Sequence, residues 1–196
     1  MEESALAPPV RLAIAYARAD LRDALSLLLR FDDRIAGIVG RSSEPMIAQM
    51  KIAWWHDAIA KTKDERPRGE PLLIELNAIE SEDVAGAMRQ ILDAWGLLLA
   101  EEQWSQDTLA TFANLRGEGI FGTYLRWIDE NAGSGLGRQW ALDDLRQRFG
   151  SRVDMSFAKP LARLPSNRSL RPLTILMLAA TAPAGFRMTW HALTGR

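Results

Sequence analysis

The sequence contains no cysteine and only two histidines among its 196 residues. The absence of cysteine excludes disulfide bonds, iron–sulfur clusters, thiolate zinc sites and a thiol nucleophile. Two histidines are too few for a histidine-rich metal site. Positive and negative charges almost cancel, with 24 lysines and arginines against 25 aspartates and glutamates. This balance gives no reason to expect nucleic-acid binding.

Long hydrophobic runs are also absent. The longest, Leu173 to Ala182, lies between two prolines and has about half of the ~20 residues that a membrane-spanning helix needs. The first residues, Met1 to Ser4, lack the cationic start of a signal peptide. We therefore expect a cytoplasmic protein, and leave open that it rests on the surface of a membrane.

Apolar residues recur at the 3.6-residue spacing of amphipathic helices through most of the chain. This spacing predicts helices over residues 10–31, 45–59, 71–79, 81–98, 105–127 and 140–149, with short apolar segments over 170–181 and 186–193. No stretch of useful length alternates between apolar and polar residues as a strand does. The sequence therefore predicts an all-α protein with a single domain over residues 1–196.

The helix over residues 45–59 supplies much of the expected core. Ile47, Met50, Trp54 and Ala58 share one face of it, and Ile52, Trp55 and Ile59 widen that face. In the helix over residues 81–98, Trp95 and Leu98 lie on one apolar stripe. We expect a core built on Trp54 or Trp55 together with Trp95 and Leu98.

Three glycines, Gly117, Gly119 and Gly122, have the spacing of a dinucleotide-binding fingerprint. That fingerprint works between a strand and a helix, whereas Leu109 to Leu115, which precede it, have helical spacing. We therefore interpret the glycines as part of a helix. Each costs about 1 kcal/mol relative to alanine inside a helix. We expect either a neighbouring helix or a ligand to approach the backbone closely here.

Two pairs of aspartates are the candidates for a metal site. Asp32 and Asp33 lie at the end of the first predicted helix, and Asp143 and Asp144 lie in a later one. Carboxylates on facing helices can hold Mg²⁺ and, through it, a diphosphate. A metal-binding cluster repeats its acid on the same helical face three or four residues later, and neither pair does so. The spacing favours a structural role and leaves a rearranged Mg²⁺ site as the alternative.

Several segments carry a family pattern, of which the most specific is Met50 to Ile59, with a lysine before a Trp-Trp pair and an acid after it. Leu27 to Ala36, Glu44 to Met46 and Gly69 to Pro71 complete the pattern. Together they resemble the squalene/phytoene synthase family. Residues 113–122 resemble the glycine-bearing helix that lies beside the prenyl chain in that family. The resemblance implies a helical bundle of the isoprenoid-synthase type, in shortened form.

The family joins two prenyl diphosphates head to head and holds Mg²⁺ with aspartate clusters on two facing helices. If Phe31 matches the family's aromatic residue, the first cluster falls on Ala36, Gly37 and Gly40, none of which has a carboxylate. The chain therefore resembles a degenerate branch of the family. That branch is represented by the mitochondrial complex I assembly factor, which keeps the tryptophan-containing helix and lacks the aspartates.

This resemblance implies a protein that has lost prenyl transfer, needs no cofactor and acts as a binding or assembly factor. Its partner is expected to be an isoprenoid or lipid tail, or another protein, and peripheral contact with the inner membrane stays open. An apolar groove between helices suits such a tail, and we expect Trp54, Gly117, Gly119 and Gly122 to line it. The alternative is an active Mg²⁺-dependent prenyl transferase whose metal site consists of the four aspartates named above.

Overall fold

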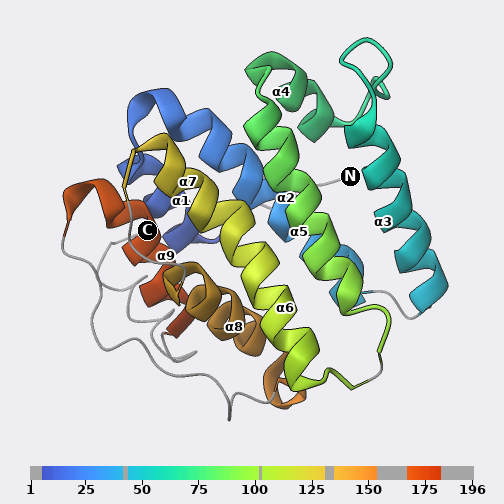
Figure 1. Ribbon diagram of the computed structural model, residues 1–196. Coiled ribbons are helices and arrows are strands. Elements are labelled where there is room, and N and C mark those ends of the chain that lie inside the picture. The colour runs from blue at the N-terminus through green and yellow to red at the C-terminus, as the bar shows by residue number, and fades with distance from the viewer. Residues whose placement is uncertain (1–5, 42–43, 102, 131–134, 154–166, 182–196) are drawn as a thin grey trace.

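The computed structural model describes residues 6–41, 44–101, 103–130, 135–153 and 167–181, and all regular elements within them are helical (Figure 1). The α-helices are α1 (Pro8–Tyr16), α2 (Arg22–Arg41), α3 (Pro45–Ala60), α4 (Pro71–Ile79), α5 (Glu82–Leu97), α6 (Gln106–Gly117), α7 (Thr123–Trp127), α8 (Gly135–Phe149) and α9 (Arg171–Thr181). The expected all-α fold is confirmed. The apolar segment over residues 186–193 lies outside the described residues.

Shorter helical turns connect several of these helices. They are η1 (Ala19–Leu21), η3 (Gly150–Arg152) and η4 (Arg168–Leu170), which are 3₁₀ turns, and η2 (Glu118–Gly122), a π-helical turn. Through η2, the polypeptide passes from α6 into α7 without leaving the helical conformation. This agrees with the helical interpretation of the glycine run.

The prediction of one continuous helix over residues 10–31 is wrong, because the chain turns between α1 and α2. Ala17 and Arg18 have extended backbone conformations there. The Arg18 guanidinium donates to both oxygens of Asp20 at 2.7 and 2.8 Å. The Arg22 guanidinium donates to the carbonyls of Ala15 and Ala17 at 3.3 and 3.4 Å. The Arg22 contacts satisfy backbone carbonyls at the end of α1, and hydrophobic spacing alone reveals neither them nor the Arg18–Asp20 pair.

Because α2 begins and ends later than the predicted helix, the first aspartate pair does not lie where the sequence placed it. Since α2 runs from Arg22 to Arg41, Asp32 and Asp33 lie in the middle of a helix rather than at its end. Side chains three and four residues apart share a helical face. Asp32 therefore lies on the same buried face as Leu28 and Ile35, and its side chain enters the core.

Serines cap the starts of α5 and α6, and both helices begin where the sequence predicts a helix. The Ser81 hydroxyl accepts from the backbone N–H of Val84 at 3.4 Å, and the Ser105 hydroxyl accepts from that of Thr108 at 3.1 Å. Each bond satisfies one of the backbone donors that a helix leaves unpaired in its first turn. These caps fix where two of the central helices begin.

The centre of the bundle is formed by α2, α5 and α6 (Figure 1). On one side α3 packs against α5 and α2, and on the other α8 packs against α6 and α9. The predicted core residues Trp55, Trp95 and Leu98 are all buried. No helix in the described ranges has both the length and the apolar character required to cross a bilayer.

The helix α3 is apolar on two opposite sides, and only one of them faces the core. Ala48, Ile52, Trp55, Ala58 and Ile59 are buried. Of the four residues that the sequence placed together on one face, Ala58 is buried, but Ile47, Met50 and Trp54 point outward. With Met46 they form what we call the α3 outer stripe: Met46 (72% exposed), Ile47 (43%), Met50 (67%) and Trp54 (43%).

Candidate functional site

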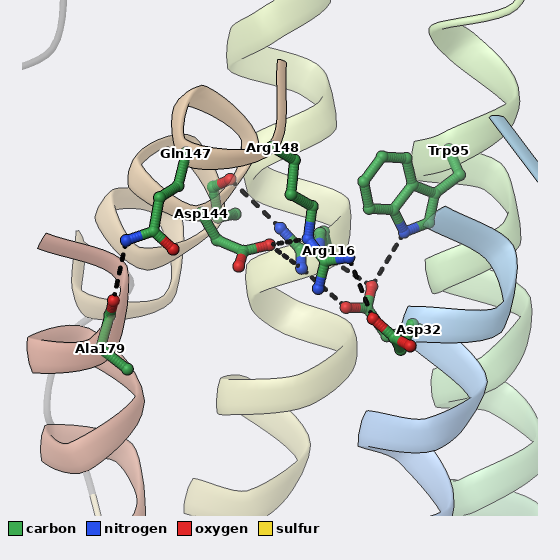
Figure 2. Close-up of polar contacts among 9 residues, drawn as sticks. Asp32, Trp95, Arg116, Asp144, Gln147, Arg148 and Ala179 are labelled. Atoms are coloured by element: carbon green, nitrogen blue, oxygen red, sulfur yellow. Dashed lines mark hydrogen bonds and ion pairs between the residues drawn. The ribbon is translucent and has the colours of Figure 1, made fainter. Parts of the chain in front are cut away.

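A buried guanidinium, that of Arg116 on α6, lies between carboxylates of α2 and α8 (Figure 2). Its Nε and Nη2 atoms donate to the two oxygens of Asp32 at 2.8 and 2.6 Å. Nη2 also donates to Asp144 at 2.5 Å, and Nη1 donates to the carbonyl of Ala141 at 3.2 Å. Arg116 is 0% exposed and Asp32 is 2% exposed, so water contributes little to their solvation.

Aromatic side chains surround this ion pair. The Trp95 indole N–H donates to Asp32 at 2.8 Å, as Figure 2 shows. The guanidinium carbon of Arg116 lies 4.2 Å from the ring centroid of Trp140, 5.0 Å from that of Trp95 and 5.8 Å from that of Phe112. A cation is attracted to the face of an aromatic ring, more strongly where water is excluded. The rings therefore replace part of the hydration that Arg116 loses on burial.

A second arginine, Arg148 of α8, extends the cluster toward the surface (Figure 2). Its Nε donates to Asp144 at 2.9 Å and its Nη1 donates to Asp33 at 3.0 Å. Asp144 thus accepts from both arginines, and the cluster joins α2, α6 and α8. We call Asp32, Asp33, Arg116, Asp144 and Arg148 the central ion cluster.

The pKa values of Asp144, Arg116 and Arg148 favour their charged forms. Burial opposes ionisation of the Asp144 carboxyl, but Arg116 and Arg148 outweigh it and hold its pKa below the usual value. Burial likewise disfavours the Arg116 cation, but Asp32 and Asp144 outweigh it and raise the pKa of Arg116. The pKa of Arg148 is raised for the same reason. Each of these three groups is therefore held ionised by its charged partners.

Three of the four candidate aspartates meet in this cluster, and the fourth does not. The Asp143 carboxylate accepts from the Gln139 amide, with both oxygens at 3.0 Å. Burial raises the pKa of Asp143. The other three surround two cations. In the described part of the chain, no group of three or more acidic or histidine side chains has a geometry that could hold a metal ion.

Two of the three predicted glycines lie against neighbouring helices. A Cβ atom on Gly117 would lie 2.6 Å from the backbone carbon of Gly137 on α8. One on Gly119 would lie 3.1 Å from the carbonyl oxygen of Ala87 on α5. At Gly122 it would meet the side chain of Glu118. Gly117 and Gly119 therefore fit the first of the two expectations, close approach of a helix.

Trp54 also has a different position from the one expected. It belongs to the α3 outer stripe, with its ring edge-on to Trp55 at a centroid distance of 5.1 Å. Trp54 therefore lies on the outer side of α3, and its role in lining an apolar groove between helices stays a prediction. Of the adjacent tryptophans, the helix directs Trp55 into the core and Trp54 outward, since neighbouring residues point about 100° apart.

Sequence reasoning did not assign Arg116 or Arg148 to the site. The available signal was the position of Arg116 within an apolar stripe, four residues after Phe112 and three after Ala113, both of which are buried. A charged residue at a core position needs a buried partner. Asp32 is likewise a charged residue at a core position, on α2.

The all-α bundle is consistent with an isoprenoid-synthase-type domain. The chain belongs to the squalene/phytoene synthase family, whose family model matches residues 9–114, more than half of the chain. The matched range contains Asp32 and Trp95 and ends just before Arg116. No curated protein and no solved structure matches the chain.

Proposed function

We propose that this protein is a non-catalytic member of the squalene/phytoene synthase family that acts as a binding or assembly factor for another protein. The observation that carries the proposal is the position of Arg116. Its guanidinium lies between the carboxylates of α2 and α8, on the two helices that supply the candidate aspartates. The positive charge that balances these acids is thus part of the protein itself.

Electrostatics argue against adding Mg²⁺ to the same carboxylates. Both oxygens of Asp32 accept bonds from Arg116, and one also accepts from Trp95. At about 4 Å from a guanidinium, a divalent cation would experience repulsion on the order of 8 kcal/mol at an effective dielectric constant of about 20. Replacing Arg116 with Mg²⁺ as the partner of Asp32 would break this buried pair and leave Asp144 as the remaining carboxylate partner of Arg116.

The α3 outer stripe supports the binding role. Met46, Met50 and Trp54 recur every four residues along one side of a helix at the edge of the bundle (Figure 1). Contiguous exposed apolar side chains on a globular protein mark contact surfaces for partners. Methionine and tryptophan are also enriched where proteins meet. By contrast, the contacts at Gly117 and Gly119 give no support to a tail between those helices.

An assay for diphosphate release tests the loss of catalysis. The purified protein is incubated with farnesyl or geranylgeranyl diphosphate and Mg²⁺, and free pyrophosphate is measured. We expect no release above a boiled sample. Mg²⁺-dependent release that disappears in Asp32→Asn would instead support the prenyl transferase alternative.

Site-specific crosslinking tests the binding role. A photoreactive amino acid is placed at Met50 in the α3 outer stripe and, as a control, at Thr111, which is exposed on α6. We expect one defined protein adduct from position 50 in cells, lost when Trp54 is changed to Asp, and none from position 111. Adducts that are equal at both positions, or unaffected by Trp54→Asp, would contradict the assignment of this surface.

A further inference from the structure

A cavity of about 560 Å³ lies at one end of the bundle, away from the central ion cluster. It is bounded by the end of α3, residues 61–66, the end of α4 and the start of α5. Ile59, Leu76 and Ala85 are buried apolar residues of its wall. Cavities of this size are in the range that holds small organic ligands.

Among the residues that line the cavity, positive charges outnumber negative charges. The charged residues are Lys61, Lys63, Arg66, Arg89, Glu80 and Glu82. The Lys63 ammonium pairs with Glu80, and the Arg89 guanidinium pairs with Glu82. Neither Lys61 nor Arg66 forms a salt bridge within the described residues, so the wall has a surplus of two positive charges.

Arg66 is held in place entirely by neutral groups. Its Nη1 donates to the side-chain oxygen of Asn77 at 2.8 Å and its Nη2 donates to the carbonyl of Ile59 at 3.2 Å. Its Nε is buried and has no hydrogen-bond partner. The nearby carboxylate of Glu65, which interacts with Lys61, accepts from Thr62 at 2.7 Å and is not part of the wall. The guanidinium is therefore oriented but not neutralised.

We propose that this cavity binds a soluble small molecule that combines a phosphate monoester with a compact apolar group. A phosphate monoester has a charge of about −1.5 to −2 at pH 7, which matches the surplus of Lys61 and Arg66. Guanidinium and ammonium donors form strong, charge-assisted bonds to phosphate oxygens. Apolar atoms exposed on the wall then contact the rest of the ligand, since phosphate alone fills only a small part of the cavity.

Calorimetry with phenyl phosphate tests this site, with benzyl alcohol as the probe that lacks the phosphate. We expect phenyl phosphate to bind and benzyl alcohol not to bind. Lys61→Gln and Arg66→Gln should each weaken binding about tenfold or more, because each removes a charge-assisted hydrogen bond. Lys51→Gln, which removes one exposed lysine of α3 outside the cavity, should leave the affinity unchanged.

Other results overturn the proposal. These are an absence of phenyl phosphate binding, equal weakening in Lys51→Gln and Lys61→Gln, and binding only to vesicles that contain phosphatidic acid. If Arg66→Gln does not fold, Lys61→Gln decides alone, because Lys61 is exposed and makes no salt bridge within the described residues. The test is independent of the proposed function, since the cavity wall includes neither the central ion cluster nor the α3 outer stripe.

Discussion

Arg116 and Asp32 form the buried pair on which the centre of the bundle depends. Changing Arg116 to Met removes the cation and leaves the Asp32 carboxylate buried without its main partner. Breaking a buried ion pair from one side costs about 3–5 kcal/mol. We expect that loss in the free energy of unfolding, measured with urea.

The double variant Asp32→Asn with Arg116→Met supplies the control. With both charges removed, the cost should be well below the sum of the two single losses, because neither charge remains unpaired. A double-mutant cycle in which the losses simply add would show that the two residues do not act as a pair.

Asp144 and Asp143 are adjacent residues whose pKa values are displaced in opposite directions. The pKa of Asp144 is below its ordinary value of 3.8 because Arg116 and Arg148 outweigh the effect of burial. Its contribution to stability is therefore present above that ordinary value and is lost as the pH falls through the lower, folded-state pKa. Asp144→Asn should reduce the loss of stability on acidification.

Asp143 is the matched comparison. Burial raises its pKa, so its contribution is present at low pH and is lost as the pH rises through the raised value. Asp143→Asn should therefore remove a small loss of stability at the upper end of the acid range. Unfolding free energies measured between about pH 1.5 and pH 7 test both signs. Identical pH profiles for the two variants would contradict the different environments described for these carboxylates.

Trp95 of α5 and Trp54 of α3 differ sharply in burial. Trp95 is 0% exposed and donates to Asp32, whereas Trp54 is 43% exposed. Truncation of a buried tryptophan costs about 3–5 kcal/mol. We expect that loss for Trp95→Ala and about 1 kcal/mol or less for Trp54→Ala, chiefly its edge-on contact with Trp55. Thermal unfolding of both variants tests the order, and equal losses would contradict the outward position of Trp54.

At the scale of the elements, the close contact between α6 and α8 explains why position 117 is a glycine, although glycine lowers the stability of a helix. A Cβ atom on Gly117 would lie 2.6 to 2.8 Å from backbone atoms of Gly137 and Arg138, which cannot move without displacing α8. Gly117→Ala should therefore destabilise the protein by about 1–3 kcal/mol through overpacking.

Gly86 on α5 is the control for this substitution. A Cβ atom there would meet only the end of the Arg89 side chain, at 3.9 Å. Gly86→Ala should stabilise the protein by about 0.5–1 kcal/mol, the usual gain inside a helix. If Gly117→Ala were equally stabilising in urea denaturation, the contact between α6 and α8 would not be as close as described.

The elements show which sequence signals were sufficient. Apolar spacing predicted the positions of α5 and α6 because this signal is local. The buried face of α3 was predicted only in part, since Ile47, Met50 and Trp54 are exposed whereas the other predicted residues, Ile52, Trp55, Ala58 and Ile59, are buried. The apolar residues of α3 lie on two opposite sides, and spacing does not say which side faces α5. The break between α1 and α2 was missed because it depends on specific contacts of Arg18 and Arg22.

At the scale of the whole molecule, the sequence predicted the all-α class and the family. Helical periodicity and the Trp-Trp pattern depend only on the order of residues along the chain. The sequence also singled out Asp32, Asp33 and Asp144. It did not predict their partners, since Arg116 is 84 positions from Asp32 along the chain and meets it only after α2, α6 and α8 pack together. Pairing across helices is a property of the packed bundle.

The proposed loss of catalysis predicts that no metal binds at the central ion cluster, where Arg116 already pairs with the carboxylates of Asp32 and Asp144. Mn²⁺, as a paramagnetic substitute for Mg²⁺, tests it through the indole N–H signals of Trp95 and Trp140, which flank Arg116. We predict that titration with Mn²⁺ leaves these two signals as sharp as those of the other tryptophans. Selective broadening of both at low Mn²⁺ concentration, reversed by a chelator, would contradict the account by showing a metal bound at the central ion cluster.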